Sequence, residues 1–243
     1  MNLIIDVGNT LVKLAVFQGA ELIGKIIVEK RDLEKKLSEI SQTHPGISGV
    51  IVSRVSPANF LWPSHLQRNA KILELSPGIV LPFENLYATP QTLGNDRIAL
   101  AAAASKMYRD RNVLVIDAGT CITYDFKNKE NQYLGGAISP GLHMRFRALN
   151  AFTANLPLVE LQKDLKLTGN STITSINSGV VYGILKEIDG VIEEYAAQYD
   201  KMVTIITGGD AHFLSINLKN SIFANSNFLL EGLNYILEFN ISQ

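Results

Sequence analysis

One short pattern occurs twice in the chain, and it limits the folds that these 243 residues can adopt. Each copy has an apolar run, then Asp-x-Gly with a nearby Thr, then an alternating run that ends in a polar turn; the copies lie at 3–17 and 113–126. A strand, a tight glycine turn, a second strand and an apolar third segment predict an antiparallel three-strand meander. Because the copies lie about half a chain apart, we expect a duplicated protein with domains at 1–110 and 111–243.

The two bends have the chemistry of a phosphate site. Gly8 and Gly119 lack a Cβ, so a ligand can approach the backbone there, and amide N–H groups and Thr hydroxyls can donate to phosphate oxygens. Asp6 and Asp117 would repel phosphate unless a cation lay between, which implies Mg²⁺ bound largely through water. The plain alternative is that Asp-x-Gly only closes a hairpin, but its recurrence at matching positions favours phosphate binding. Neither a Walker A loop nor a dinucleotide-binding glycine motif is present.

The segments outside the repeats alternate between strand and helix patterns. Apolar runs at 49–53 and 71–75 predict strands, and residues 30–40 predict a helix with one apolar stripe. A long helix is expected at 171–198 and a closing amphipathic helix at 228–239. Strands that alternate with helices favour the α/β class.

Composition excludes several kinds of protein. An apolar fraction of 47% suffices for a packed core, and a net charge of −1 gives no electrostatic footprint for nucleic acid. The longest apolar run is far shorter than the ~18 residues of a membrane helix, and no secretory signal is apparent. The single cysteine, Cys121, cannot form an intrachain disulfide, which favours a reduced, cytoplasmic setting. The scattered histidines show no zinc-ligand spacing.

A second informative stretch is Gly-Asn-Asp-Arg at 94–97, directly before an Ala-rich helix expected at 98–108. Asn95 or Asp96 is the natural N-cap, and Asp96 could do nothing more than cap. Arg97 argues against that, because a cation in the first helical turn opposes the helix dipole. An arriving anion would be attracted both by Arg97 and by the free N–H groups. We therefore predict a carboxylate-recognition corner with Asp96 beside it as a base.

Taken in order, these motifs resemble type III pantothenate kinase. The resemblance covers nearly the whole chain and is carried by 6–10 with Lys13, 93–97, 117–120, 135–136, 140–141, Thr172, 175–176, Gly179 and 208–210. It implies two actin-like (ribonuclease H-like) domains of the acetate and sugar kinase, Hsp70 and actin superfamily. One departure is Ser-Arg-Val-Ser-Pro at 53–57, where the family usually has Ser-Ser-Val-Val-Pro; it concerns local geometry rather than chemistry.

The resemblance also implies an activity, the ATP-dependent phosphorylation of pantothenate, which is the first step of coenzyme A biosynthesis. Mg²⁺ would accompany ATP, and Asp117 would bind a monovalent cation, potassium or ammonium. The residues expected to hold the ATP phosphates are Asp6, Val7, Gly8, Asn9, Thr10, Leu11, Val12, Lys13 and Thr120.

On the substrate side, the resemblance makes Asp96 the proton acceptor. The residues expected to bind pantothenate are Tyr87, Gly94, Asn95, Asp96, Arg97 and Thr172. The family is typically a homodimer with its substrate pocket near the subunit interface, so a second copy of the chain is the expected partner.

Three other functions stay open at this point. A superfamily kinase for a different small hydroxy acid or sugar would keep both bends but lack the motif at 94–97. A non-catalytic regulator of the Bvg accessory factor type shares the family's pattern, although a pure binding module has no need of a base. A phosphatase acting on polyphosphate fits least, because the balanced charge offers no basic groove.

Overall fold

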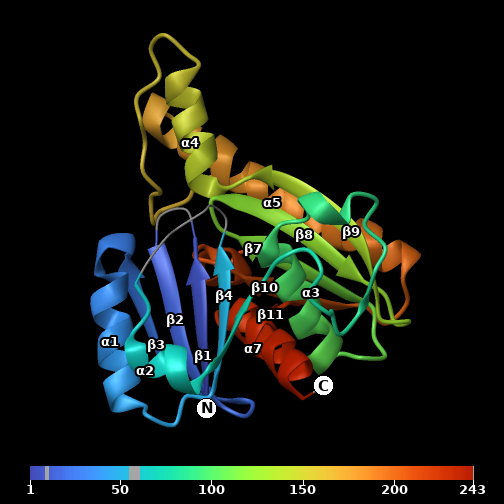
Figure 1. Ribbon diagram of the computed structural model, residues 1–243. Helices are drawn as coiled ribbons and strands as arrows, with labels where there is room; N and C mark the ends of the chain where they lie inside the picture. The colour runs from blue at the N-terminus through green and yellow to red at the C-terminus, as the bar shows by residue number, and fades with distance from the viewer. Residues whose placement is uncertain (9–10, 55–60, 243) are drawn as a thin grey trace. The chain divides into compact units, whose positions relative to one another are not determined.

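A computed structural model of the chain describes residues 1–8, 11–54 and 61–242 (Figure 1). It divides into two compact units, each a mixed sheet flanked by helices, which confirms the α/β prediction. The first unit comprises Met1–Arg109, Asn131–Tyr133 and Asn227–Gln243, and the second comprises Asp110–Glu130 and Leu134–Ser226. None of the helices in the described ranges is both long and apolar enough to cross a membrane.

The sheet of the first unit has the strand order β3-β2-β1-β4-β5 in the described part of the chain. These strands are β1 (Asn2–Val7), β2 (Leu11–Gln18), β3 (Glu21–Glu29), β4 (Gly49–Arg54) and β5 (Lys71–Glu74). β2 pairs antiparallel with both β1 and β3, which is the expected meander, while β4 and β5 add parallel strands. The unit's remaining elements are η1 (Lys30–Asp32), α1 (Leu33–Thr43), α2 (Ser64–Asn69), β6 (Glu84–Asn85), η2 (Pro90–Thr92), α3 (Asn95–Met107) and α7 (Phe228–Ile241).

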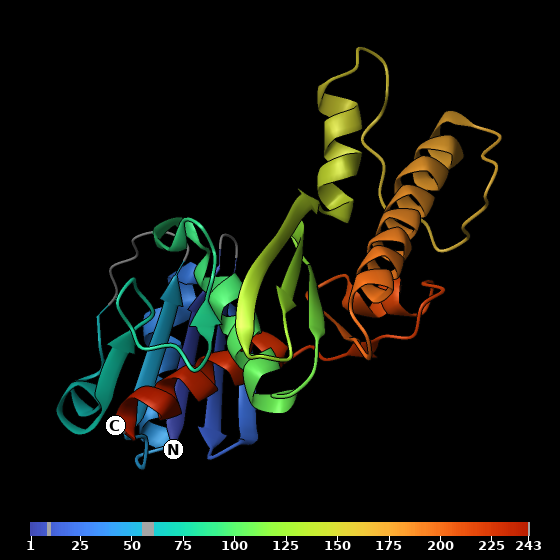
Figure 2. The same cartoon turned by 90° about the vertical axis from the view of Figure 1, so that its right-hand side faces the viewer.

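The alternation of β1 decides which side chains reach the site, because successive side chains of a strand point to opposite faces. Leu3, Ile5 and Val7 pack with α1 and α2 on one face. On the other face Asn2 donates a hydrogen bond to Asn234 of α7 at 2.8 Å. Figures 1 and 2 show α3 and α7 on that second face, opposite α1. Asp6 has the same parity as Asn2 and therefore faces the α3 side.

Helices α3 and α7 pack against each other through small residues. A Cβ added to Gly232 of α7 would lie 1.8 Å from the backbone oxygen of Ala99 in α3, so only glycine permits this approach. The start of α3 is fixed by Asn95, whose amide donates to the backbone oxygens of Arg54 at 3.2 Å and Leu75 at 3.0 Å. The N-terminus of α3 is thereby held at the carboxyl ends of β4 and β5.

The second unit repeats the plan around a sheet of strand order β11-β10-β7-β8-β9 among its described residues. Its elements are β7 (Val113–Ala118), β8 (Cys121–Lys127), β9 (Gln132–Pro140), α4 (Leu142–Ala151), α5 (Thr172–Gln198), β10 (Val203–Thr207), α6 (Ala211–Ser215) and β11 (Phe223–Ala224). β7 pairs antiparallel with β8 and parallel with β10. The first two residues of β9 pair with β6 and cluster with the first unit.

The core of the second unit lies between its sheet and helices α4, α5 and α6. Leu114, Ile116 and Ala118 of β7 belong to this core, so Asp117 points to the opposite face. The long helix expected at 171–198 is confirmed as α5, and a capping box between Ser171 and Thr174 starts it.

Candidate active site

The first bend forms as the repeat predicted. Asp6 lies opposite Lys13 of β2 and Ser53 of β4 in the sheet register. The Lys13 ammonium is 3.7 Å from the Asp6 carboxylate, and the N–H of Gly8 donates to the oxygen of Leu11 at 3.0 Å to close the turn. Of the residues expected at this bend, Asn9 and Thr10 lie outside the described residues.

The other residues expected at this bend differ in what they expose. The side chains of Val7 and Val12 lie in the core, so these residues can offer a phosphate only their backbone groups. Leu11 is exposed. The departure from the family pattern at 53–57 is described only for Ser53 and Arg54.

Only 8% of Asp6 is exposed, and burial of a carboxylate disfavours its charged form. Burial is the largest influence and raises the pKa of Asp6; Lys13 and a hydrogen bond with Ser53 pull it down, and the negative charge of Asp96 raises it again. Asp6 lies opposite Ser53 in the sheet, and Asn95 bonds the oxygen of the next residue, Arg54, so Asp6 and Asp96 lie near each other at the carboxyl ends of β1 and β4. The first bend and the start of α3 thus bring two carboxylates into one site within the first unit.

The start of α3 corrects one sequence prediction. The helix begins at Asn95 rather than near residue 98, and its N-cap is Gly94, not Asn95 or Asp96. Both polar side chains have other partners: Asn95 binds the ends of β4 and β5, and Asp96 accepts a hydrogen bond from the N–H of Arg97 at 2.9 Å. A Cβ on Gly94 would lie 2.4 Å from Asp96 Oδ1. Glycine at position 94 is therefore what allows Asp96 its position.

Arg97 is buried, with 4% of the residue exposed. Its guanidinium carbon lies 5.5 Å from the centre of the Tyr87 ring and 6.0 Å from that of Tyr133. Tyr87 was expected to bind pantothenate, and it is half-buried beside Arg97. Tyr133 was missed, because only the pairing of β6 with β9 brings it next to residues so distant in sequence.

The second bend belongs to the second unit, and three segments meet at it. The N–H of Gly119 donates to the oxygen of Cys121 at 3.0 Å, and that of Gly141 to the oxygen of Thr120 at 3.2 Å. Gly208 has a φ of +98°, and a Cβ there would lie 2.4 Å from Asp117 Oδ1. The Gly-Gly turn after β10 thus packs directly against Asp117, while Thr120 is exposed at the tip of the bend.

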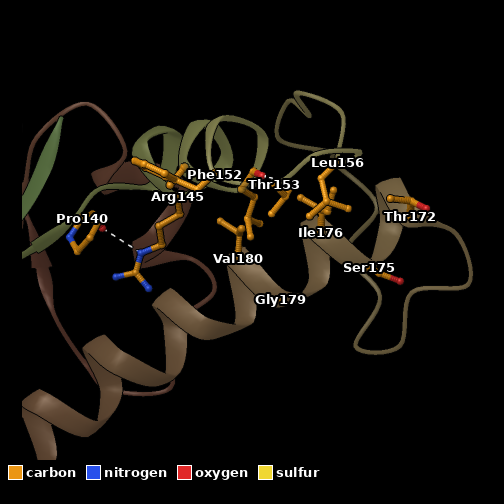
Figure 3. Close-up of a pocket in the computed structure, with 12 residues that line it drawn as sticks. Pro140, Arg145, Phe152, Thr153, Leu156, Thr172, Ser175, Ile176, Gly179 and Val180 are labelled. Carbon is orange, nitrogen blue, oxygen red and sulfur yellow. Dashed lines mark hydrogen bonds between the residues drawn. The ribbon is translucent and has the colours of Figure 1, made fainter.

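A groove of about 910 Å³ lies between α4 and α5 in the second unit (Figure 3). Its apolar walls include Phe152, Leu156 and Ile176, and Thr172 lies at one end. At the other end Arg145 donates to the oxygen of Pro140 at 3.0 Å. Thr172, which was expected to bind substrate, is therefore an exposed residue of this groove.

The predicted residues thus form two sets. Asp6, Lys13, Tyr87, Asp96 and Arg97 lie in the first unit, where the two carboxylates and the guanidinium flank the start of α3. The second set, Asp117, Thr120 and Thr172, lies in the second unit. Within the described ranges, no group of three or more His, Cys, Asp or Glu side chains could hold a metal ion by itself.

Solved structures with the same architecture define the class. Glucokinase from an Antarctic psychrotroph aligns with a TM-score of 0.56 at 13% identity, covering 98% of this chain and 98% of that one. A protein from Campylobacter jejuni described as a Baf family transcriptional activator aligns with a TM-score of 0.61 at 22% identity, covering 99% and 100%. The fold is the actin-like fold of two mixed α/β units, which confirms the expected fold class.

The sequence comparisons identify the family within that class. A family model described as type III pantothenate kinase matches residues 2–194. Proteins named type III pantothenate kinase from Christiangramia forsetii and Flavobacterium johnsoniae are 52% and 45% identical, covering 100% and 99% of this chain and 100% and 99% of their own lengths. The chain belongs to the type III pantothenate kinase family and is therefore an enzyme, a kinase.

Proposed function

We propose that the protein transfers the γ-phosphoryl group of ATP to the primary hydroxyl of pantothenate, which yields 4'-phosphopantothenate and begins coenzyme A biosynthesis. Family membership supports the reaction. The structural observation that carries it is the meeting of Asp6, at a predicted phosphate bend, with Asp96 and Arg97 at the start of α3. One small region of the first unit then offers groups for a phosphate, a hydroxyl and a carboxylate.

Asp96 is the proposed proton acceptor. Phosphoryl transfer has a loose transition state, so positioning and charge neutralisation supply most of the acceleration. Asp96 orients the hydroxyl and takes its proton late in the step, a contribution typically worth about 10²–10⁴-fold. The N–H of Arg97 holds one oxygen of its carboxylate, Oδ1, and the other oxygen is the proposed acceptor for the hydroxyl proton.

Arg97 is the proposed partner of the substrate carboxylate. A guanidinium can bind a carboxylate through two parallel hydrogen bonds, and such charge-assisted bonds are strengthened where water is excluded. The burial of Arg97 meets that condition. Tyr87, Gly94, Asn95 and Thr172 complete the proposed set of substrate residues.

ATP is the proposed phosphate donor, with the first bend (residues 6–13) and Thr120 around its phosphates. Mg²⁺ usually binds through one or two carboxylates together with waters and substrate phosphates. The Asp6 carboxylate at the first bend fits that requirement, and the ion would supply charge neutralisation on the transferred group. Asp117, against which the Gly-Gly turn after β10 packs, would hold potassium or ammonium.

We also propose a division of labour between a first domain at 1–110, which carries the first phosphate bend and the carboxylate-recognition corner, and a second at 111–243, which carries the second phosphate bend and the nucleotide-side Gly-Gly turn. Helix α7, at the end of the second range, clusters with the first unit. The proposed setting is the cytoplasm, and the proposed partner is a second copy of the chain.

The groove between α4 and α5 is our candidate for the dimer surface, because Phe152 in its wall is 88% exposed and Thr172 lies at its end. Sedimentation of the wild type should show a dimer that Phe152→Glu dissociates; a wild-type monomer would contradict the proposal.

The activity is tested by incubating the purified protein with pantothenate, Mg²⁺ and γ-labelled ATP, and by identifying the product by mass. Label transferred to pantothenate is the expected result. Transfer only to another hydroxy acid or a sugar would identify a different kinase, and no transfer to any acceptor would favour a regulator. Complete retention of Asp6, Asp96 and Asp117 favours catalysis, since binding alone requires no proton acceptor.

A further inference from the structure

Tyr133 forms an aromatic cluster at the carboxylate-recognition corner. It is fully buried, at 0% exposed, and its ring centre lies 6.2 Å from those of both Tyr87 and Phe83. The guanidinium carbon of Arg97 lies 6.0 Å from the Tyr133 ring and 5.5 Å from the Tyr87 ring. These distances, with the 6.2 Å between the two tyrosines, describe a nearly equilateral triangle. The guanidinium carbon therefore lies at a similar distance from both rings.

The backbone holds this cluster in place. Asn85 of β6 pairs with Tyr133 of β9, and the N–H of Leu86 donates to the oxygen of Tyr133 at 3.0 Å. The N–H of Tyr87 donates to the Asn85 side chain at 3.0 Å, and the Asn131 amide donates to the oxygen of Pro82 at 2.9 Å. These bonds fix the backbone on either side of the cluster, and complete burial restrains the Tyr133 ring beside Arg97.

The contact has a consequence for carboxylate binding. A buried cation loses its hydration, and the negative face of an aromatic ring returns part of that stabilisation while leaving the N–H edge of the guanidinium for an anion. Fixing a long side chain beforehand also lowers the ordering cost of binding. A neutral ring does this without competing for the charge, whereas an acidic partner at the same place would compete with the substrate.

We propose that Tyr133 is a positioning residue that holds the Arg97 guanidinium ready for the substrate carboxylate and thereby sets the preference for an acid over a neutral analogue. This inference rests on the proposed function, specifically on Arg97 as the carboxylate partner. Tyr133 acts through Arg97 and takes no part in the transfer of the phosphoryl group.

The test compares two single substitutions in the cluster. Tyr133→Leu removes one of the two rings that contact the Arg97 guanidinium. It should raise KM for pantothenate about tenfold, which is within the range of a buried cation–π contact. KM for ATP should stay within about twofold of wild type. Phe83→Leu removes a ring that touches Tyr133 but keeps both rings that contact the Arg97 guanidinium, and it should lower Tm without moving KM for pantothenate. Tyr133→Phe, which keeps the ring, should behave like wild type.

Specificity supplies a second readout. Pantothenol, in which an alcohol replaces the carboxylate, lacks the group that Arg97 would bind. The ratio of kcat/KM for pantothenate to that for pantothenol should fall about tenfold in Tyr133→Leu and should not change in Phe83→Leu. If Tyr133→Leu does not fold, phenylalanines of increasing fluorination at position 133 keep the ring's size while weakening its negative face, and KM for pantothenate should rise stepwise with fluorination.

Several outcomes would overturn the inference, and they are separable from failure of the proposed function. Suppose that the wild type is active and that Arg97→Ala binds pantothenate poorly. An unchanged KM for pantothenate in Tyr133→Leu, or across the fluorinated series, then refutes the role of Tyr133 and leaves the proposed function standing. Equal KM effects of Tyr133→Leu and Phe83→Leu refute it as well. An Arg97→Ala variant with normal KM, or a wild type that does not phosphorylate pantothenate, refutes the proposed function and this inference together.

Discussion

At the scale of single residues, the site concentrates charges that the fold would be more stable without. Asp6 is desolvated beside a second carboxylate, and the lysine 3.7 Å away does not cancel the effect of burial on its pKa. Such a group is tolerated where it does chemistry. The position of Asp6 could be predicted from the repeated bend, but its environment could not, because Asp96 is about ninety residues away in sequence.

Replacing Asp6 by Asn should therefore stabilise the ligand-free protein while it impairs use of Mg²⁺-ATP. The fold raises the pKa of Asp6, so the wild type is favoured at low pH, below the ordinary pKa of about 3.9, and loses that stability as pH rises through the raised value. Asp6→Asn should consequently have the higher Tm at pH 7, and the difference should vanish below about pH 4. Thermal melts across this pH range measure it, with the exposed Asp32→Asn as the control. A lower Tm for Asp6→Asn at pH 7 would contradict the argument.

Gly94→Ala should separate activity from stability. The added Cβ would meet the end of the Asp96 side chain, which can swing away at little cost to the fold. We expect kcat to fall at least about tenfold, because Asp96 no longer points at the hydroxyl, while Tm stays within a few degrees of wild type. Gly24→Ala, where a Cβ meets nothing within 4 Å, is the matched control. Normal kcat in Gly94→Ala would show that Asp96 does not need this position.

At the scale of elements, sequence patterns predicted most helices and strands. They were wrong where favoured capping side chains form other hydrogen bonds instead. Asn95 and Asp96 are favoured N-cap residues, yet α3 starts one residue after Gly94, since both side chains bond elsewhere. The capping box and the apolar spacing of α5 had no such competition, and that helix is as expected. Tyr133 escaped prediction because a two-residue strand pairing leaves no periodic signal.

The close packing of α3 on α7 makes its own prediction. A Cβ at Gly232 would meet backbone atoms of Ala99, which cannot move without the helix, so Gly232→Ala should destabilise by about 1–3 kcal/mol or more. Gly183→Ala in α5, where the Cβ has open space, should stabilise by up to about 1 kcal/mol. Urea unfolding of both variants measures the contrast. Equal effects of the two changes would mean that α3 and α7 are not in close contact.

At the scale of the whole molecule, the duplication could be predicted because each half repeats a strand, a bend and a second strand. The sequence pattern could not show that the last helix packs with the first unit. Helix α7 clusters with the first unit, and the residues that bring it there are Asn234, bonded to Asn2, and Gly232, packed on Ala99. The first contact joins the two ends of the sequence, and the second joins its end to helix α3. No local pattern encodes them, since their partners are set by the tertiary fold.

Asp96, which Gly94 allows to lie beside the first phosphate bend, is the proposed acceptor of the proton of the pantothenate hydroxyl. The most direct measurement is single-turnover transfer from γ-labelled ATP to pantothenate by Asp96→Asn, with calorimetric binding of pantothenate and the thermal melt recorded on the same preparation. We predict a rate lowered at least about 10²-fold, with binding and Tm close to wild type. Near-normal transfer by Asp96→Asn would contradict the account.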